Sequence, residues 1–90
     1  MTVTSTEYLR LRALNIRVYS TPNCGPCRAA KAYLDEQGVP YTSYDVSADR
    51  EKLKEMLQLT NGQNGVPVIR IGDRHMRGYS KEWLKKTLGL

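Results

Sequence analysis

Residues that ligate metals are scarce in this sequence. The 90 residues contain two cysteines, Cys24 and Cys27, and a single histidine, His75. A structural zinc site needs four ligands, drawn chiefly from these two residue types. One copy of the chain therefore cannot complete such a site, and we expect no resident metal.

Long apolar segments are missing too. No run is long enough to cross a bilayer, and residues 1–6 have neither the basic start nor the apolar centre of a secretory signal. We therefore expect a cytoplasmic protein without membrane contact. In that reducing compartment a cysteine pair is more often catalytic than structural.

Clustered basic charge is absent, although the net charge is +5 at pH 7. Lys and Arg are scattered from Arg10 to Lys86, and no aromatic–basic signature of an RNA-binding domain is present. We expect no nucleic-acid ligand, because scattered charge is better suited to steering the protein toward acidic protein partners. The short chain has no internal repeat and should form one small, monomeric domain.

Both cysteines lie between a predicted strand and a predicted helix. The apolar run Ile16–Tyr19 leads into the turn-forming Thr21-Pro22-Asn23, and the residues from Pro26 onward favour a helix. Cys24-Gly25-Pro26-Cys27 thus begins a helix that follows a strand. Two thiols three positions apart in that place can form and break a disulfide with little movement of the chain.

Cys24 is predicted to be the more reactive sulfur. It falls at or just before the first helical turn, where unpaired backbone N–H groups and the positive end of the helix dipole favour an anion. These interactions should lower the pKa of the Cys24 thiol from ~8.5 toward ~7, so no catalytic base is required. Pro26 suits the first turn because its missing N–H would be unpaired there. Gly25 leaves the backbone beside the sulfurs open to a partner.

Three other uses of the cysteine pair stay open at this point. A disulfide that closes so short a loop would contribute only roughly 2 kcal/mol, which makes the pair a weak structural staple. An iron–sulfur or metal carrier would use Cys24 in a site shared between two chains, and a purified protein with colour or metal would favour it. The chain could also be a basic binding module with idle cysteines, in which case Cys24→Ser would keep all function.

The order of the elements is predicted to be βαβαββα. Residues 1–13 form an extension whose structure is ambiguous, because Thr4 and Glu7 would make a helical capping box whereas residues 9–13 alternate as a strand does. The other expected elements are a strand at 14–20, a helix from about Gly25 to Gln37, a strand at 41–46, a helix capped by Ser47 or Asp49, a hairpin of 66–71 and 75–78 around Gly72-Asp73, and a last helix capped by Ser80.

The sequence resembles the thioredoxin superfamily and, within it, the glutaredoxins. The resemblance rests on Cys24-Gly25-Pro26-Cys27 after the first strand, Val66-Pro67 at the start of the third and Gly78 before the last helix. It covers residues 14–90 and implies an α/β, thioredoxin/glutaredoxin-like fold with a four-stranded mixed sheet flanked by helices. It also implies that Cys24 is the nucleophile and that Cys27 resolves the mixed disulfide.

In that family the bond before the strand-opening proline is cis. The resemblance therefore implies a cis bond between Val66 and Pro67, with the Val66 backbone offered to an extended substrate. A peptide or glutathione would be such a substrate.

Several positions depart from the glutaredoxin pattern. Thr21 stands where glutaredoxins usually carry a Lys or Arg that holds a glutathione carboxylate. Pro26 replaces the usual aromatic residue, which counts against a glutaredoxin-type cluster. Their Thr-Val-Pro is Gly65-Val66-Pro67 here, and their Gly-Gly with the acidic residues after it is Gly78-Tyr79-Ser80-Lys81. The usual glutathione site is therefore only partly present.

Two further residues are candidates for substrate contact. Arg28 is near enough along the helix to supply a cation in place of the missing one, and Tyr79 follows the hairpin at the end that should face the cysteines. His75 is expected to be a solvated side chain on an edge strand, and Trp83 is expected to belong to the core.

The resulting hypothesis is a thiol–disulfide oxidoreductase that reduces protein disulfides or glutathione-mixed disulfides and carries electrons in cell redox homeostasis. No bound cofactor is expected, and glutathione or a flavoenzyme of the thioredoxin-reductase type would return the electrons. We expect a dithiol reductant to be preferred to glutathione. The predicted catalytic residues are Cys24 and Cys27, and the predicted substrate-binding residues are Thr21, Pro26, Arg28, Val66, Pro67, Gly78 and Tyr79.

Overall fold

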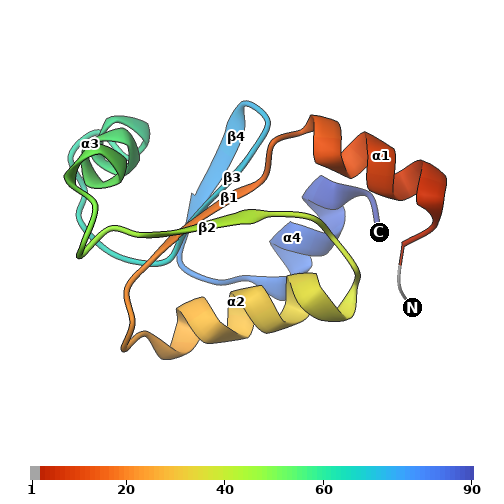
Figure 1. Cartoon of the computed structure of the whole chain (residues 1–90), viewed down its shortest axis with the longest axis horizontal. Coiled ribbons are helices and arrows are strands. Elements are labelled where there is room, and N and C mark those ends of the chain that lie inside the picture. Colours follow the sequence, from red (N-terminus) through yellow and green to blue (C-terminus); the bar gives the residue numbers. More distant parts are fainter. Residues whose placement is uncertain (1–2) are drawn as a thin grey trace.

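The computed structural model describes residues 3–90, and in that range helices and strands alternate along the chain (Figure 1). The α/β class with a four-stranded mixed sheet flanked by helices is confirmed, and the predicted βαβαββα order follows an additional first helix. The elements are α1 (Ser5–Ala13), β1 (Arg17–Ser20), α2 (Gly25–Glu36), β2 (Thr42–Asp45), α3 (Arg50–Leu59), β3 (Val68–Ile71), β4 (Arg74–Arg77) and α4 (Lys81–Leu88).

The first helix resolves the ambiguity of the N-terminal extension. Thr4 and Glu7 form the capping box, each side chain bonded to the other residue's backbone N–H. Leu11, on the inner side of α1, is fully buried in the main core. The helical alternative therefore prevails over the strand, because a buried leucine and a satisfied N-terminus outweigh a short alternating pattern. Residues 1 and 2 of the extension lie outside the described residues.

The first strand is shorter than the sequence suggested. Leu14 caps α1, and Asn15 has a positive φ of 54°, so the chain turns before extended pairing begins at Arg17. At the other boundaries the sequence was a closer guide. Gly38, with φ of 69°, follows the end of α2 as predicted, since a left-handed residue ends a helix there without a Cβ clash.

The strands are arranged in the order β2-β1-β3-β4. β1 runs parallel to β2 and antiparallel to β3, which pairs in turn with β4. Tyr19 is opposite Val68, and Val68 is opposite Arg77. The end of β1, the start of β3 and the end of β4 therefore lie at the same edge of the sheet, the one formed by strand ends. Cys24 lies just beyond this edge, because it follows β1 along the chain.

Helices cover both faces of the sheet. Figure 1 shows α3 on one side of the strands and α2 with α4 on the other. The alternation along β1 follows this division, because Val18 packs in the cluster that contains α2 and α4 residues and Tyr19 packs with Met56 of α3. The larger cluster contains Leu11, Ile16, Val18, Ala30, Tyr33, Leu34, Val39, Ile69, Ile71, Leu84 and Leu88. The smaller contains Tyr19, Val46, Met56 and Val68.

Candidate active site

The two cysteines lie at the N-terminus of α2. Cys24 is the N-cap residue, with extended backbone dihedrals, and its Sγ accepts a hydrogen bond from the Cys27 backbone N–H at 3.1 Å. Pro26 lies in the first turn, where its missing N–H leaves no donor unpaired. The Cys24 sulfur thus occupies the place where serine or aspartate oxygens usually cap a helix, and where an anion is favoured.

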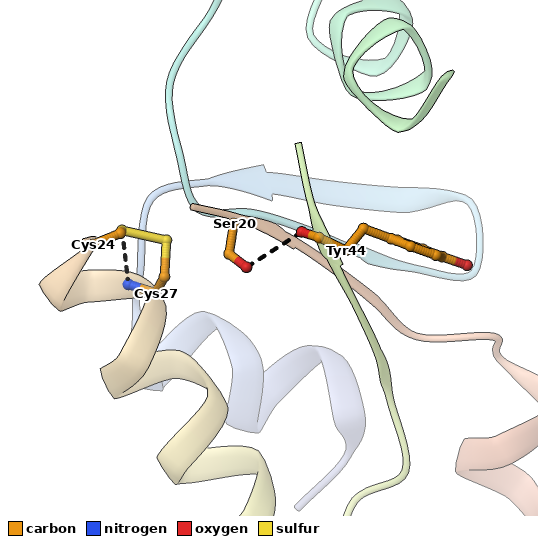
Figure 2. The surroundings of a disulfide bond; sticks show 4 residues. All are labelled: Ser20, Cys24, Cys27 and Tyr44. Carbon is orange, nitrogen blue, oxygen red and sulfur yellow. Dashed lines mark hydrogen bonds between the residues drawn. A yellow bond between two sulfur atoms is a disulfide. The ribbon is translucent and has the colours of Figure 1, made fainter. Parts of the chain in front are cut away.

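The cysteines form a disulfide, and their Cα atoms are 5.2 Å apart (Figure 2). Cys24 retains 8% of its accessible surface and Cys27 only 1%. The sulfur chemistry of this pair is therefore asymmetric. An incoming thiol or disulfide reaches Cys24 first, while Cys27 is shielded and can act only on a partner already attached to Cys24.

The Val66–Pro67 segment lies at the same edge of the sheet as the cysteines. The bond between the two residues is cis, as predicted. The Pro67 carbonyl accepts a hydrogen bond from the Gly78 N–H at 2.7 Å, and Gly78 has a φ of 98°, which glycine adopts without a Cβ clash. Within residues 3–90, the N–H and C=O of Val66 make no hydrogen bond. Those two groups are available to pair with an added strand.

The other predicted site residues are held less closely. Thr21 is half-buried in the turn before Cys24, whereas Pro26 and Arg28 are exposed on the first turn of α2. Tyr79 is half-buried and packs against the larger core cluster. Within residues 3–90, the side chains of Arg28 and Tyr79 have no hydrogen-bond or ion-pair partner. The structure thus places the cysteine pair and the hydrogen-bonded Pro67 and Gly78 at the same end of the sheet.

Ser20 is a site neighbour that sequence reasoning missed. It is 3% exposed, and its hydroxyl donates to the Tyr44 carbonyl at 3.3 Å. Figure 2 shows Ser20 at the end of β1, between the disulfide and β2. The hydroxyl ties the end of β1 to its parallel neighbour just before the cysteine loop. A serine that ends an apolar run gives no distinctive signal, because the same residue commonly ends strands that have no site.

A second missed feature is a polar cluster on the α3 side of the sheet. Glu55 accepts hydrogen bonds from the Tyr19 hydroxyl and Arg17, and from Lys52 at 3.1 Å. The Tyr19 hydroxyl is the main cause of a Glu55 pKa lowered to about 2; burial opposes this shift, and Lys52 and Arg17 add to it. Burial, with Glu55 nearby, raises the pKa of Tyr19 to about 12. These groups join α3 to β1 on the face of the sheet opposite to the one covered by α2, the helix that begins at the cysteines.

His75 and Trp83 lie where the sequence analysis expected them. His75 is exposed on the edge strand β4, and Trp83 is half-buried against the larger core cluster. In residues 3–90, no three His, Cys, Asp or Glu side chains are grouped so that they could hold a metal ion. None of the helices described is both long and apolar enough to span a membrane.

Comparison with known proteins finds glutaredoxin-like relatives. The Glutaredoxin family model matches residues 16–76, more than half of the chain. N-acetyl-S-hydroxy-L-cysteine reductase of Bacillus subtilis is 44% identical over 59 residues, which are 66% of this chain and 62% of that protein. This chain thus spans less than two thirds of that relative. A glutaredoxin-like 8.6 kDa protein from the rubredoxin operon of Clostridium pasteurianum is 34% identical over 73 residues, 81% of this chain and 96% of its own length.

A solved structure supports the same fold. The glutaredoxin-like protein NrdH-redoxin from Escherichia coli superposes with a TM-score of 0.71 at 21% identity, covering 80% of this chain and 92% of that one. At that identity the likeness concerns the fold. The family match, the near full-length relative and the helix-capping cysteine pair agree, and this chain therefore belongs to the glutaredoxin family.

Proposed function

We propose that this protein is a dithiol–disulfide oxidoreductase that reduces disulfides in other proteins and carries the electrons for that reaction. The observation that carries the proposal is the asymmetric pair at the N-terminus of α2, in which Cys24 is the more exposed sulfur and accepts a backbone N–H, whereas Cys27 is almost fully buried. The family membership supports a thiol–disulfide redox role.

The reaction follows from that asymmetry. The Cys24 thiolate attacks one sulfur of the substrate disulfide, so that a Cys24–substrate bond forms, the substrate S–S bond breaks, and the departing thiolate takes a proton. The Cys27 thiolate then attacks Cys24 Sγ and releases the second substrate thiolate. Two electrons pass from the dithiol to the substrate, and the Cys24–Cys27 disulfide remains, which is the state of the pair in this structure.

The substrate is proposed to dock on the Val66 backbone. The free N–H and C=O of Val66 lie at the cysteine edge of the sheet, and an extended segment that pairs with them would lie beside Cys24. Pro67 and Gly78 hold this backbone in place through their hydrogen bond. Thr21, Pro26, Arg28 and Tyr79 would border the docked segment, and we propose them as secondary contacts.

We propose a dithiol reductant, such as a flavoenzyme of the thioredoxin-reductase type, as the electron source. Thr21 lacks the positive charge with which glutaredoxins usually hold a glutathione carboxylate, and a charge-assisted hydrogen bond contributes about 1.5–3 kcal/mol. NrdH-redoxin from E. coli, which has the same fold, is a glutaredoxin-like protein with a thioredoxin-like activity profile, and this supports the choice. The protein is proposed to act as a monomer in the reducing cytoplasm, where such a pair can be recycled.

The test is to recycle the oxidised protein with two NADPH-dependent systems, thioredoxin reductase alone and glutathione with glutathione reductase. We expect NADPH consumption with thioredoxin reductase and an added protein disulfide, and slow consumption with glutathione. Cys24→Ser is the control and should abolish both signals. Fast recycling by glutathione and none by thioredoxin reductase would make the protein an ordinary glutathione-dependent glutaredoxin.

A second candidate substrate is a small cysteine sulfenic acid. The B. subtilis relative, which is 44% identical over the aligned part, is named for reduction of N-acetyl-S-hydroxy-L-cysteine. The same dithiol could reduce such a compound, because Cys24 would displace hydroxide to give a mixed disulfide, and Cys27 would release N-acetylcysteine with net formation of water. Release of N-acetylcysteine by the reduced protein, measured by mass spectrometry and absent with Cys24→Ser, would support this candidate.

A further inference from the structure

Arg77 reaches into space that glycine leaves open at position 65. Arg77 is the last residue of β4, and its Nη1 lies 3.2 Å from the position a Cβ would take on Gly65, with its Cδ at 3.8 Å. The contact to Nη1 is closer than ordinary van der Waals packing allows. A residue with a side chain at position 65 would therefore push the guanidinium aside by a few tenths of an ångström.

Within residues 3–90, the Arg77 guanidinium makes no ion pair and no hydrogen bond. Arg77 is exposed, and no carboxylate of residues 3–90 lies within ion-pair distance of it. Its side chain also donates no hydrogen bond in that range, in contrast to Arg17, which bonds Glu55, and Arg10, which bonds the Leu88 carbonyl. An arginine fork in this state can bind a carboxylate with two parallel hydrogen bonds.

The Arg77 guanidinium lies next to the backbone on which the substrate is proposed to dock. Gly65 directly precedes Val66, and Gly78, which follows Arg77, bonds to Pro67. The guanidinium therefore lies at one end of the segment on which a substrate strand would pair. Because an extended strand advances only about 3.3 Å per residue, we expect a side chain one or two residues from the reacting cysteine of a docked substrate to lie near Arg77.

A hollow beside Arg77 has room for an acidic side chain of a docked substrate. It has a volume of about 300 Å³ and is lined by Arg77, His75, Thr60 and Gln63, with Leu59 and Asn61. None of these lining residues is acidic. The hollow offers a carboxylate polar neighbours and the positive charge of Arg77.

We infer that Arg77 is a specificity residue, which selects disulfide substrates with a carboxylate next to the reacting cysteine. The inference rests on the proposed function, because it assigns a substrate class to the same site. Gly65 favours this selection, since the absence of a Cβ leaves the guanidinium unobstructed beside Val66.

The test compares peptide disulfides that differ in one charge. The probes are the homodimeric disulfides of acetyl-Cys-Asp-amide and acetyl-Cys-Asn-amide, with a second pair in which the Asp or Asn precedes the cysteine. For the reduced wild-type protein we expect a kcat/KM about three- to tenfold higher for one acidic probe than for its amide partner, as befits one exposed charge pair. The preference should shrink as salt is added.

Variants connect the preference to Arg77. In Arg77→Gln the acidic and amide probes should react at equal rates, and Gly65→Thr should weaken the preference because its side chain crowds the guanidinium. Arg74→Gln is the matched control, since Arg74 is exposed at the opposite end of the same strand, and it should keep the wild-type preference. Equal rates for both probes in the wild-type protein, or an unchanged preference in Arg77→Gln, would overturn the inference.

A neutral substrate separates this inference from the proposed function. Reduction of 4,4′-dithiodipyridine needs the dithiol but offers Arg77 no carboxylate. We expect the wild-type, Arg77→Gln and Arg74→Gln proteins to reduce it at the same rate and Cys24→Ser not to reduce it. If the wild-type protein fails on this probe, the proposed function fails; if it succeeds without an acidic preference, only the role of Arg77 is lost.

Discussion

The backbone N–H of Cys27 donates a hydrogen bond to Cys24 Sγ over 3.1 Å. In the reduced protein this donor and the end of α2 would stabilise a Cys24 thiolate, and nothing comparable serves the buried Cys27. Iodoacetamide should therefore label Cys24 first, with the midpoint of its rate against pH clearly below the ~8.5 of a free thiol. Peptide mapping after partial labelling gives the measurement. Equal labelling of both cysteines with a midpoint near that of a free thiol would contradict it.

The hydrogen bonds of Glu55 should make a contribution to the free energy of unfolding that depends on pH. Glu55→Gln should lower the free energy of unfolding at pH 7 by about 1–2 kcal/mol, because the charged acceptor for Tyr19, Arg17 and Lys52 is lost. The folded-state pKa of Glu55 is about 2, below its ordinary value of 4.5. The wild-type advantage should thus be complete above pH 4.5 and disappear as the pH falls toward 2.

Urea unfolding at several pH values measures this difference. Glu36→Gln is the control, because Glu36 is exposed on α2 and no hydrogen bond or ion pair to the rest of residues 3–90 involves it. An advantage that stays constant from pH 7 to pH 2 would show that Glu55 does not carry the effect through its charge.

Helix α1 should contribute to the stability of the whole domain. Leu11 is fully buried, whereas Leu9 on the same helix is 64% exposed. Leu11→Ala should cost about 2–5 kcal/mol of unfolding free energy, and the matched Leu9→Ala less than about 0.5 kcal/mol. Equally small effects of the two substitutions would mean that α1 adds little stability, and would support the prediction that residues 1–13 are an extension of a glutaredoxin-like domain at 14–90.

The electron source depends on the missing cation at position 21. Thr21→Lys should raise the rate of recycling by glutathione by roughly ten- to a hundredfold, since one charge-assisted contact of about 1.5–3 kcal/mol is restored. The coupled glutathione reductase assay measures it, and recycling by thioredoxin reductase is the internal control. If the rate stays flat and Arg28→Gln lowers it instead, Arg28 already supplies the charge.

The sequence predicted best where a local pattern has one physical solution. Cys24-Gly25-Pro26-Cys27 between an apolar run and a helix-forming stretch predicted a cysteine pair at a helix N-terminus, and Gly38 predicted the end of that helix. The exposed edge position of His75 also followed from its place in a hairpin after the core strand.

Features that depend on distant segments were beyond the sequence. The choice between helix and strand for residues 5–13 was decided by the burial of Leu11 in the larger core cluster, which also contains Leu34 of α2 and Leu88 of α4. The Arg77–Gly65 contact joins the end of β4 to a loop before β3, and no local pattern encodes it. Only the absence of the usual threonine at position 65 gave a signal, and the space it leaves could be recognised only in three dimensions.

Trapping of a mixed disulfide on Cys24 tests the central claim most directly. Reduced Cys27→Ser is mixed with an oxidised peptide disulfide, and the intact mass is measured before and after addition of dithiothreitol. The protein should gain the mass of one peptide on Cys24 and lose it with dithiothreitol, because the resolving thiol is absent. No adduct on Cys27→Ser, or continued turnover of disulfide by Cys24→Ser, would contradict the assignment of Cys24 as the nucleophile and Cys27 as the resolving residue.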